Sequence, residues 1–226
     1  MIMIGKSHTS GQTLFVMKFG KKEYMQQLID EGLVYFNCTD FFRKSPISEQ
    51  GDPFEGAGIV DRGKIVSYRS TLLNEKLFCL WHLNDEDAPM VDSMKEIEGD
   101  LWELIFDTNK KELLELVNTN KSDFRIVFIH NHKEFNNRLR KELDKHYKGR
   151  YWSNKVSYYD ATIAEYMPIS PFMKTMYYRN QSELRYLVLD DEINISKPLE
   201  IRIGNISDIA KIFPMSLIKM RVHIQK

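Results

Sequence analysis

Phe124-Arg125-Ile126-Val127-Phe128-Ile129 is the clearest strand signal in this 226-residue sequence. It is short, apolar and rich in aromatic and β-branched residues, which predicts a central β-strand. From about Lys133 to His146 the pattern changes to helical spacing, because Phe135, Leu139 and Leu143 recur four residues apart. The sequence therefore predicts a buried strand followed by an amphipathic helix.

Strand-like and helical stretches continue on both sides of this pair, without a regular rhythm. Strands are predicted at 14–19, 33–36, 59–66, 76–82, 153–160, 184–189, 199–203 and 217–224, helices or helical turns at 21–31, 110–117 and 206–213, and loops at 37–58 and in the acidic segment to Gly99. Gly32 is expected to end the first helix as a left-handed C-cap. Because no repeating βαβ unit is present, we expect an α+β fold with a mixed, largely antiparallel sheet. We expect one domain over residues 1–226, with a helical insertion at roughly 84–150.

The composition narrows the class of protein further. With 42% hydrophobic and 28% charged residues, the chain is suited to one sizeable globular core. No apolar stretch approaches the roughly 18 residues of a membrane span, and the first residues lack the charge order of a signal peptide. We therefore expect a cytoplasmic protein with no membrane partner. Cys38 and Cys79 have no CxxC or histidine-spaced partner, and the acids of 85–103 form no pair suited to Mg²⁺, so no metal site is expected.

The charges balance overall but are unevenly placed. Lys and Arg total 32, as do Asp and Glu, so no global field selects nucleic acid or membrane. The segment from Lys133 to Lys155 contains eight basic residues and only three acids, and Tyr147, Tyr151 and Trp152 are interleaved with them. Two interpretations remain open: a solvated helix face, or a basic aromatic surface for a phosphate-bearing substrate.

Gln181-Ser182-Glu183 precedes the predicted strand at 184–189. A carboxylate at the start of a strand, two residues after a polar side chain, suits a reaction that develops positive charge on a ribosyl ring. Glycosidases meet the same demand with a carboxylate beside the oxocarbenium ion. The alternative is a structural carboxylate on the strand, sharing a face with Arg185.

This tripeptide resembles the catalytic turn of ADP-ribosyltransferases, and an upstream segment adds to the resemblance. Lys18 ends a strand, a helix follows, and Leu28-Ile29-Asp30-Glu31-Gly32-Leu33 is similar to the family's step into the next strand. The resemblance implies a split antiparallel sheet with flanking helices, NAD as co-substrate, and NAD contacts by Lys18 and Phe19. Family members carry His or Arg where this chain has Lys18, and Lys lacks their planar hydrogen-bonding geometry.

A second resemblance is to an uncharacterised bacterial family, often found near defence genes. Its motifs match Asp52-Pro53-Phe54-Glu55, Val156-Ser157-Tyr158-Tyr159-Asp160 and Glu183-Leu184-Arg185, in the expected order. In a transferase site, Tyr158 or Tyr159 would stack on nicotinamide, and strand alternation places the two on opposite faces. Arg185 would orient the Glu183 carboxylate or bind a pyrophosphate.

Together these patterns favour an NAD-dependent ADP-ribosyltransferase, of a toxin or phage-defence type. Glu183 would stabilise the ribosyl cation and Gln181 would position a nucleic-acid or protein acceptor, with an antitoxin protein as a further expected partner. Gln181 argues against simple arginine modification, because the family favours Glu at that position for arginine acceptors. The alternative hypothesis is a non-enzymatic regulatory or binding module on the same fold.

Overall fold

A computed structural model describes residues 3–5, 15–45, 51–83, 91–98, 101–106, 123–191, 197–214 and 219–225. The chain divides into two compact units, each assembled from segments distant in sequence. Unit 1 comprises residues 1–33, 80–141 and 202–226, and unit 2 comprises 34–79 and 142–201. The described residues form a mixed α+β structure with mostly antiparallel sheets and few helices, as expected at that level.

Unit 1 contains an antiparallel sheet in which the predicted central strand has neighbours on both sides. Its elements are β2 (Phe15–Lys21), the end of β6 (Glu75–Leu83), β9 (Phe124–Ile129) and β16 (Ala210–Pro214), with helices α1 (Lys22–Asp30) and α4 (His132–Leu143). The strands follow the order β6-β2-β9-β16. Residues 126–129 of β9 are buried, as are Phe135, Leu139 and Leu143 of α4. The predicted strand and its amphipathic helix are therefore confirmed.

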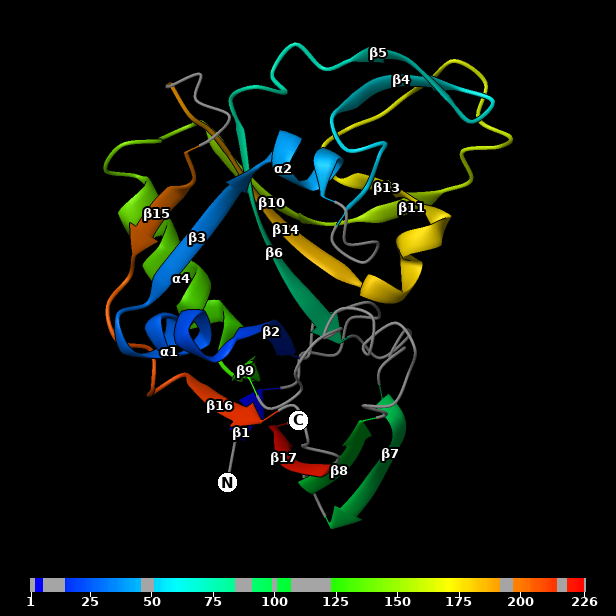
Figure 1. The fold of residues 1–226 in the computed structure, drawn as a ribbon. Helices are drawn as coiled ribbons and strands as arrows, with labels where there is room; N and C mark the ends of the chain where they lie inside the picture. The colour runs from blue at the N-terminus through cyan, green and yellow to red at the C-terminus, as the bar shows by residue number, and fades with distance from the viewer. Residues whose placement is uncertain are drawn as a thin grey trace. The chain divides into compact units, whose positions relative to one another are not determined.

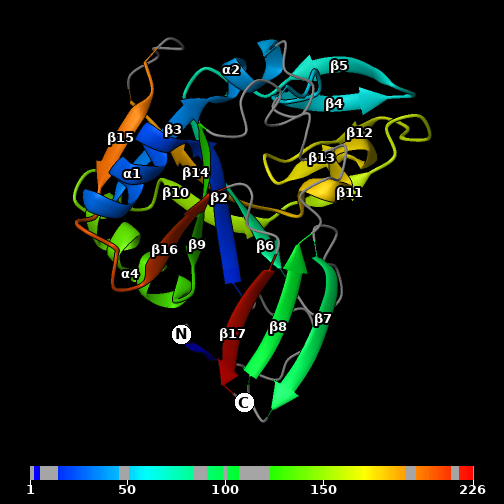
Figure 2. The same cartoon turned by 60° about the horizontal axis from the view of Figure 1, so that its bottom comes forward.

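A second sheet of unit 1 has the order β1-β17-β8-β7, and three of its strands run side by side in Figure 2. Its members are β1 (Met3–Gly5), β7 (Val91–Glu98), β8 (Leu101–Phe106) and β17 (Lys219–Gln225). The prediction of a loop up to Gly99 is wrong, because β7 pairs with β8 from Val91 opposite Phe106 to Glu98 opposite Leu101. Cross-strand pairing has overridden the low strand propensity of an acidic stretch. The helix predicted at 110–117 lies outside the described residues.

The range 84–150 was expected to be a helical insertion. Its described part contains strands β7, β8 and β9 and helix α4. Within that range β9 pairs with β2 over six residue positions, from Val16 opposite Ile129 to Lys21 opposite Phe124.

Unit 2 is built around β6, which has β14 on one side and β3 on the other. Its elements are β3 (Leu33–Cys38), α2 (Thr39–Lys44), β4 (Ala57–Asp61), β5 (Lys64–Tyr68), β10 (Tyr151–Lys155), β11 (Ser157–Tyr159), β12 (Met167–Pro168), β13 (Met173–Thr175), the 3-10 helix η1 (Met176–Gln181), β14 (Glu183–Leu189) and β15 (Leu199–Arg202). Figure 1 shows β10, β14 and β6 as neighbours and β4 and β5 as a hairpin.

The strand predicted at 153–160 is interrupted at Val156. Residues 151–155 form β10 and pair with β14, whereas 157–159 form β11 and pair in parallel with β13. The Val156 N–H donates to the Glu183 carbonyl at 2.8 Å and ends the first pairing. The chain changes partners at this residue, so Tyr158 and Tyr159 belong to a short separate strand beside the start of β14.

Two smaller predictions also need correction. The loop predicted at 37–58 contains the helix α2, and the helical turn predicted at 206–213 becomes strand β16 from Ala210 onward. β16 pairs with β9 from Ala210 opposite Ile129 to Pro214 opposite Arg125. A separate observation concerns membranes: within the described ranges, every helix is too short or too polar to cross a bilayer.

Candidate functional site

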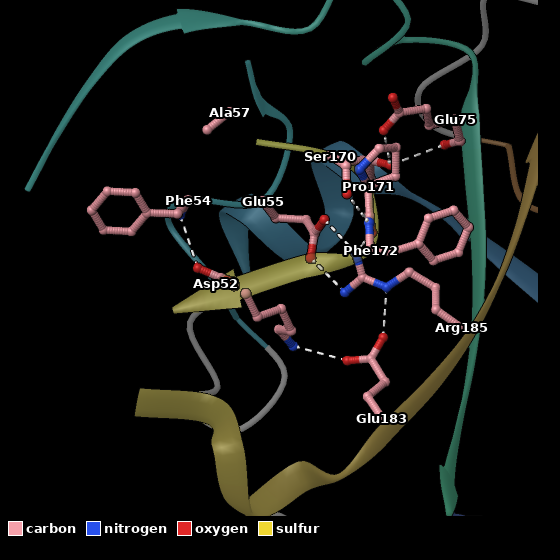
Figure 3. A network of polar contacts seen from close by, with 12 residues as sticks. Asp52, Phe54, Glu55, Ala57, Glu75, Ser170, Pro171, Phe172, Glu183 and Arg185 are labelled. Atoms are coloured by element: carbon pink, nitrogen blue, oxygen red, sulfur yellow. Dashed lines mark hydrogen bonds and ion pairs between the residues drawn. The ribbon is translucent and has the colours of Figure 1, made fainter. Parts of the chain in front are cut away.

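Side chains from three distant motifs meet inside unit 2 and form a buried charged cluster (Figure 3). Glu55 comes from the turn before β4, Lys174 from β13, and Glu183 and Arg185 from β14. Charged side chains are rarely buried unless they are paired. The fold therefore has to keep these charged side chains paired with one another.

A left-handed turn sets the position of Glu183. η1 ends at Gln181, and Ser182 takes φ 40° and ψ 58° before β14 begins. The Glu183 N–H then donates to the Tyr158 hydroxyl at 3.0 Å. Tyr158 is thus the tyrosine of β11 that reaches the start of β14, and it holds the main chain at Glu183.

Arg185 connects two carboxylates, as Figure 3 shows. Its Nε donates to Glu183 Oε1 at 2.6 Å, and its Nη1 and Nη2 donate to the two carboxylate oxygens of Glu55 at 2.9 Å each. Nη1 also donates to the Pro171 carbonyl. The paired bonds to Glu55 have the bidentate geometry that suits a guanidinium. The alternation of β14 puts Arg185 on the same face as Glu183, which is the arrangement expected from the sequence.

Lys174 holds the second oxygen of Glu183. Its Nζ donates to Glu183 Oε2 at 3.1 Å and to Gln181 Oε1 at 2.8 Å, and lies 4.6 Å from the centre of the Tyr178 ring. Lys174 therefore joins Gln181 to Glu183. It was missed in the sequence, although a lysine inside the apolar run Phe172-Met173-Lys174-Thr175-Met176 is a signal for a buried ion pair.

The charges of the cluster keep Glu183 ionised. Burial raises the pKa of Glu183, but the positive charges of Arg185 and Lys174 outweigh this and hold that pKa well below its usual range. Burial lowers the pKa of Lys174, and the Glu183 charge offsets this so that its pKa is raised. Cys79, on β6, also contributes a side-chain hydrogen bond that lowers the Glu183 pKa. The site thus presents a fixed carboxylate anion between two cations.

Asp52 and Tyr159 lie at the acidic end of the cluster. The Phe54 N–H donates to Asp52 Oδ1 at 2.9 Å, and the Glu55 N–H donates to the Asp52 carbonyl at 2.8 Å, which fixes the turn. Burial and the nearby Glu55 charge raise the pKa of Asp52 to about 6. Burial, with Asp52 and Glu55 nearby, raises the pKa of Tyr159 to about 12. The buried Tyr159 hydroxyl makes no hydrogen bond within the described part of the chain.

A second buried ion pair borders the first. Arg69 donates to both carboxylate oxygens of Glu75, at 2.8 and 2.6 Å, and lies 4.0 Å from Glu55. The hydroxyls of Thr71 and Thr39 donate to the same Glu75 carboxylate at 2.6 and 3.1 Å. Among the described residues, the two neighbouring groups contribute four carboxylates, from Asp52, Glu55, Glu75 and Glu183, and three cations, from Arg69, Lys174 and Arg185. When all of them are ionised, the cluster carries one more negative than positive charge.

The other sequence-predicted residues make different contacts. Tyr159, whose hydroxyl lies near Asp52 and Glu55, also packs in an apolar cluster with Ala57 and Val60. Lys18 and Phe19 lie on β2 in unit 1, whereas Glu55, Lys174, Glu183 and Arg185 belong to unit 2. Phe19 packs edge-on against Trp81, with ring centres 5.2 Å apart.

Several cations of the basic run at 133–155 are paired with acids. Arg138 donates to Asp208 at 2.5 Å and to Glu134 at 2.9 Å, and Arg150 pairs with Asp191. These pairs agree with the interpretation of a solvated charged face, since exposed pairs of this kind are common on helix surfaces.

Comparisons with known proteins provide no relative. No protein-family model matches the chain, and neither the curated proteins nor the solved structures include a match. The geometry of the charged cluster is therefore what bears on function.

Proposed function

We propose that the chain is an NAD-dependent ADP-ribosyltransferase in which Glu183 stabilises the ribosyl cation. The observation that carries this proposal is the position of the Glu183 carboxylate, fixed at the start of β14 by Arg185 and Lys174 and adjoining Gln181. A carboxylate that stays ionised and oriented is what a developing oxocarbenium ion requires.

The proposed reaction uses this arrangement. The bond between the nicotinamide nitrogen and the ribose carbon breaks, and its electron pair leaves with nicotinamide. The Glu183 anion offsets the positive charge on the ribose while the acceptor attacks the same carbon and releases its proton to water. Gln181 is two residues before Glu183 and positions the acceptor, which is a nucleic-acid or protein group.

Access is the main demand that the proposal makes on the structure. The side chain of Glu183 is 4% exposed and that of Lys174 is 6% exposed. NAD therefore has to displace Lys174 from Glu183, and the pyrophosphate of NAD is an anion that competes for such a cation. The resulting open state exposes the carboxylate to the ribose.

A non-enzymatic binding module is the second candidate, and the same burial favours it. Each oxygen of Glu183 already accepts a hydrogen bond from a cation, which is the arrangement of a structural ion pair. In this alternative the cluster holds the β13, η1 and β14 segments together and performs no chemistry.

Nicotinamide release from labelled NAD separates the two candidates. The wild-type chain is incubated with NAD and with total RNA or total protein, beside Glu183→Gln and the surface control Glu165→Gln. The transferase proposal expects release and label transfer by the wild type and by Glu165→Gln, and loss of both in Glu183→Gln. Expression of the active chain is expected to slow growth, and Glu183→Gln to relieve this.

A folding control keeps the assay decisive, because Glu183→Gln also removes a buried charge. Thermal melting of each variant shows whether it is folded at the assay temperature. Gln181→Ala leaves the ion pairs of Glu183 in place and is expected to reduce transfer to the acceptor more than hydrolysis of NAD. A folded wild type that neither binds nor cleaves NAD would refute the transferase proposal and leave the binding module.

A further inference from the structure

A cysteine and a lysine lie opposite each other in the interior of unit 2, away from the contacts of Glu183. Cys38 ends β3 and is the antiparallel partner of Lys76 on β6. The Lys76 Nζ donates to the Cys38 Sγ at 3.0 Å and to the Lys197 carbonyl at 2.7 Å. Lys76 is 0% exposed and Cys38 is 3% exposed.

The two reactive atoms are in contact and held by the sheet. Oxidation of a cysteine sulfur gives a sulfenic acid, which condenses with a neighbouring nucleophile when one is within reach. Fixing two groups side by side raises their effective concentration greatly. We propose that Cys38 and Lys76 form a covalent nitrogen–oxygen–sulfur bridge when the chain is exposed to hydrogen peroxide.

The bridge forms in three balanced steps. One peroxide oxidises the Cys38 thiol to the sulfenic acid and is reduced to water. The Lys76 ammonium loses a proton to water, and a second peroxide oxidises the resulting amine to a hydroxylamine, again with release of water. The sulfenic acid and the hydroxylamine then condense, so that one oxygen joins sulfur to nitrogen and a third water leaves. The chain gains one oxygen atom and loses two hydrogen atoms.

The bridge would tie the end of β3 to the beginning of β6. The neighbouring residues Thr39, at the start of α2, and Glu75, at the start of β6, are already joined, since the Thr39 hydroxyl donates to Glu75 Oε2 at 3.1 Å. Cys38 and Lys76 are 38 residues apart in sequence, so the bridge closes a loop across unit 2. Closing such a loop restricts the unfolded chain, and we expect a higher melting temperature after oxidation.

Cys79 provides a matched control on the same strand. Its side chain hydrogen-bonds to the Glu183 carboxylate, which offers no amine nitrogen for this reaction. Oxidation at Cys79 is therefore expected to add oxygen without the loss of two hydrogens. The proposal is independent of the transferase activity.

The test is intact-mass and peptide mass spectrometry of the folded chain after peroxide treatment. We expect one added oxygen and two lost hydrogens in the wild type and in Cys79→Ser, with the peptides of residues 38 and 76 joined. The joined species is expected to be absent from Cys38→Ser and Lys76→Met, and from wild type oxidised in denaturant. A thiol reductant should restore the original mass and melting temperature.

The same mass measurement can overturn the proposal. No bridge forms if folded wild type and Cys79→Ser remain unchanged or gain only oxygen at Cys38, and if the peptides of residues 38 and 76 are detected separately. This outcome stands even if the Cys38 or Lys76 variant fails to fold, because it is read from chains that keep both residues.

Discussion

The Glu183 carboxylate is the shared acceptor of Arg185 and Lys174, so removing it leaves two buried cations short of a partner. Breaking a buried pair by removing one member typically costs about 3–5 kcal/mol, because a charge stays in the interior without compensation. We therefore expect Glu183→Ala to lower the free energy of unfolding by about this amount. Urea denaturation of wild type and variant measures the difference.

Glu165 supplies the comparison on the surface of the same unit. Its carboxylate pairs with Arg62 at 2.8 Å, but its side chain is 68% exposed. Exposed ion pairs contribute about 0–1 kcal/mol, so Glu165→Ala should have a small effect. Equal losses in the two variants would show that burial of the Glu183 pairs is not what stabilises this region.

Asp52 links stability to pH with a sign opposite to that of Glu183. Its folded-state pKa of about 6 is above the usual 3.8, so the folded chain binds this proton more tightly than the unfolded chain. The contribution of Asp52 to stability is therefore full below about pH 4, falls as the pH rises to about 6, and stays low above that. A difference of about two pKa units corresponds to about 3 kcal/mol.

Asp52→Asn removes the ionisation and keeps an oxygen for the Phe54 N–H. The variant should gain about 3 kcal/mol relative to wild type between about pH 4 and about pH 7. Denaturation of both proteins across this range measures the gain, and the other titrating groups largely cancel in the comparison. A difference that is flat across the window, or that grows toward low pH, would contradict the raised pKa.

At the scale of elements, local patterns predicted some structures and missed others for identifiable reasons. β9 was predicted because its run is short, apolar and rich in β-forming residues, and α1 because its apolar residues recur at helical spacing. β7 was missed because its acidic composition hides a pairing with β8 that only the folded chain provides. The break at Val156 was missed for the same reason, since it depends on the carbonyl of Glu183.

The contacts of the candidate site also include some that the sequence predicted and some that it missed. Glu183 and Arg185 are two apart on one strand, so their shared face was predictable from alternation. The partnership of Arg185 with Glu55 spans 130 positions and depends on tertiary folding. Lys174 sits on a strand of only three residues, which is too short to show a period.

The end of α1 gives a prediction about backbone conformation. Gly32 follows the helix with φ 61°, and a Cβ added there would meet the Gly204 carbonyl oxygen at 2.1 Å. Gly32→Ala therefore combines a left-handed backbone with a collision against main-chain atoms that cannot swing aside. We expect it to lower the free energy of unfolding by about 2–5 kcal/mol.

Gly149 separates the two causes. It has φ 76°, but nothing lies within 4 Å of an added Cβ. Gly149→Ala should therefore cost only the backbone term, about 1–2 kcal/mol. Thermal melting of the two variants tests the comparison, and a Gly149→Ala loss as large as that of Gly32→Ala would show that the close approach to Gly204 is unimportant.

At the scale of the whole molecule, the chain passes between the two units several times. Unit 1 uses three segments and unit 2 uses two, so neither unit corresponds to one continuous stretch. The ends of the chain also meet, because Met3 of β1 is paired with His223 of β17. Contacts between residues so far apart in sequence are slow to form, and we expect folding on the millisecond-to-second scale or slower.

Residues 142–201 form the second segment of unit 2. Expressed alone, this fragment carries Lys174, Glu183 and Arg185 but lacks Glu55 and the β6 strand beside β14. Losing Glu55 from the Arg185 pair costs about 3–5 kcal/mol, a large part of the 5–15 kcal/mol that typically stabilises a domain. We therefore expect no cooperative thermal transition by circular dichroism from the fragment alone. Adding a fragment of residues 34–79 should restore a transition. If the fragment of residues 142–201 shows a cooperative transition by itself, the charged cluster does not hold unit 2 together.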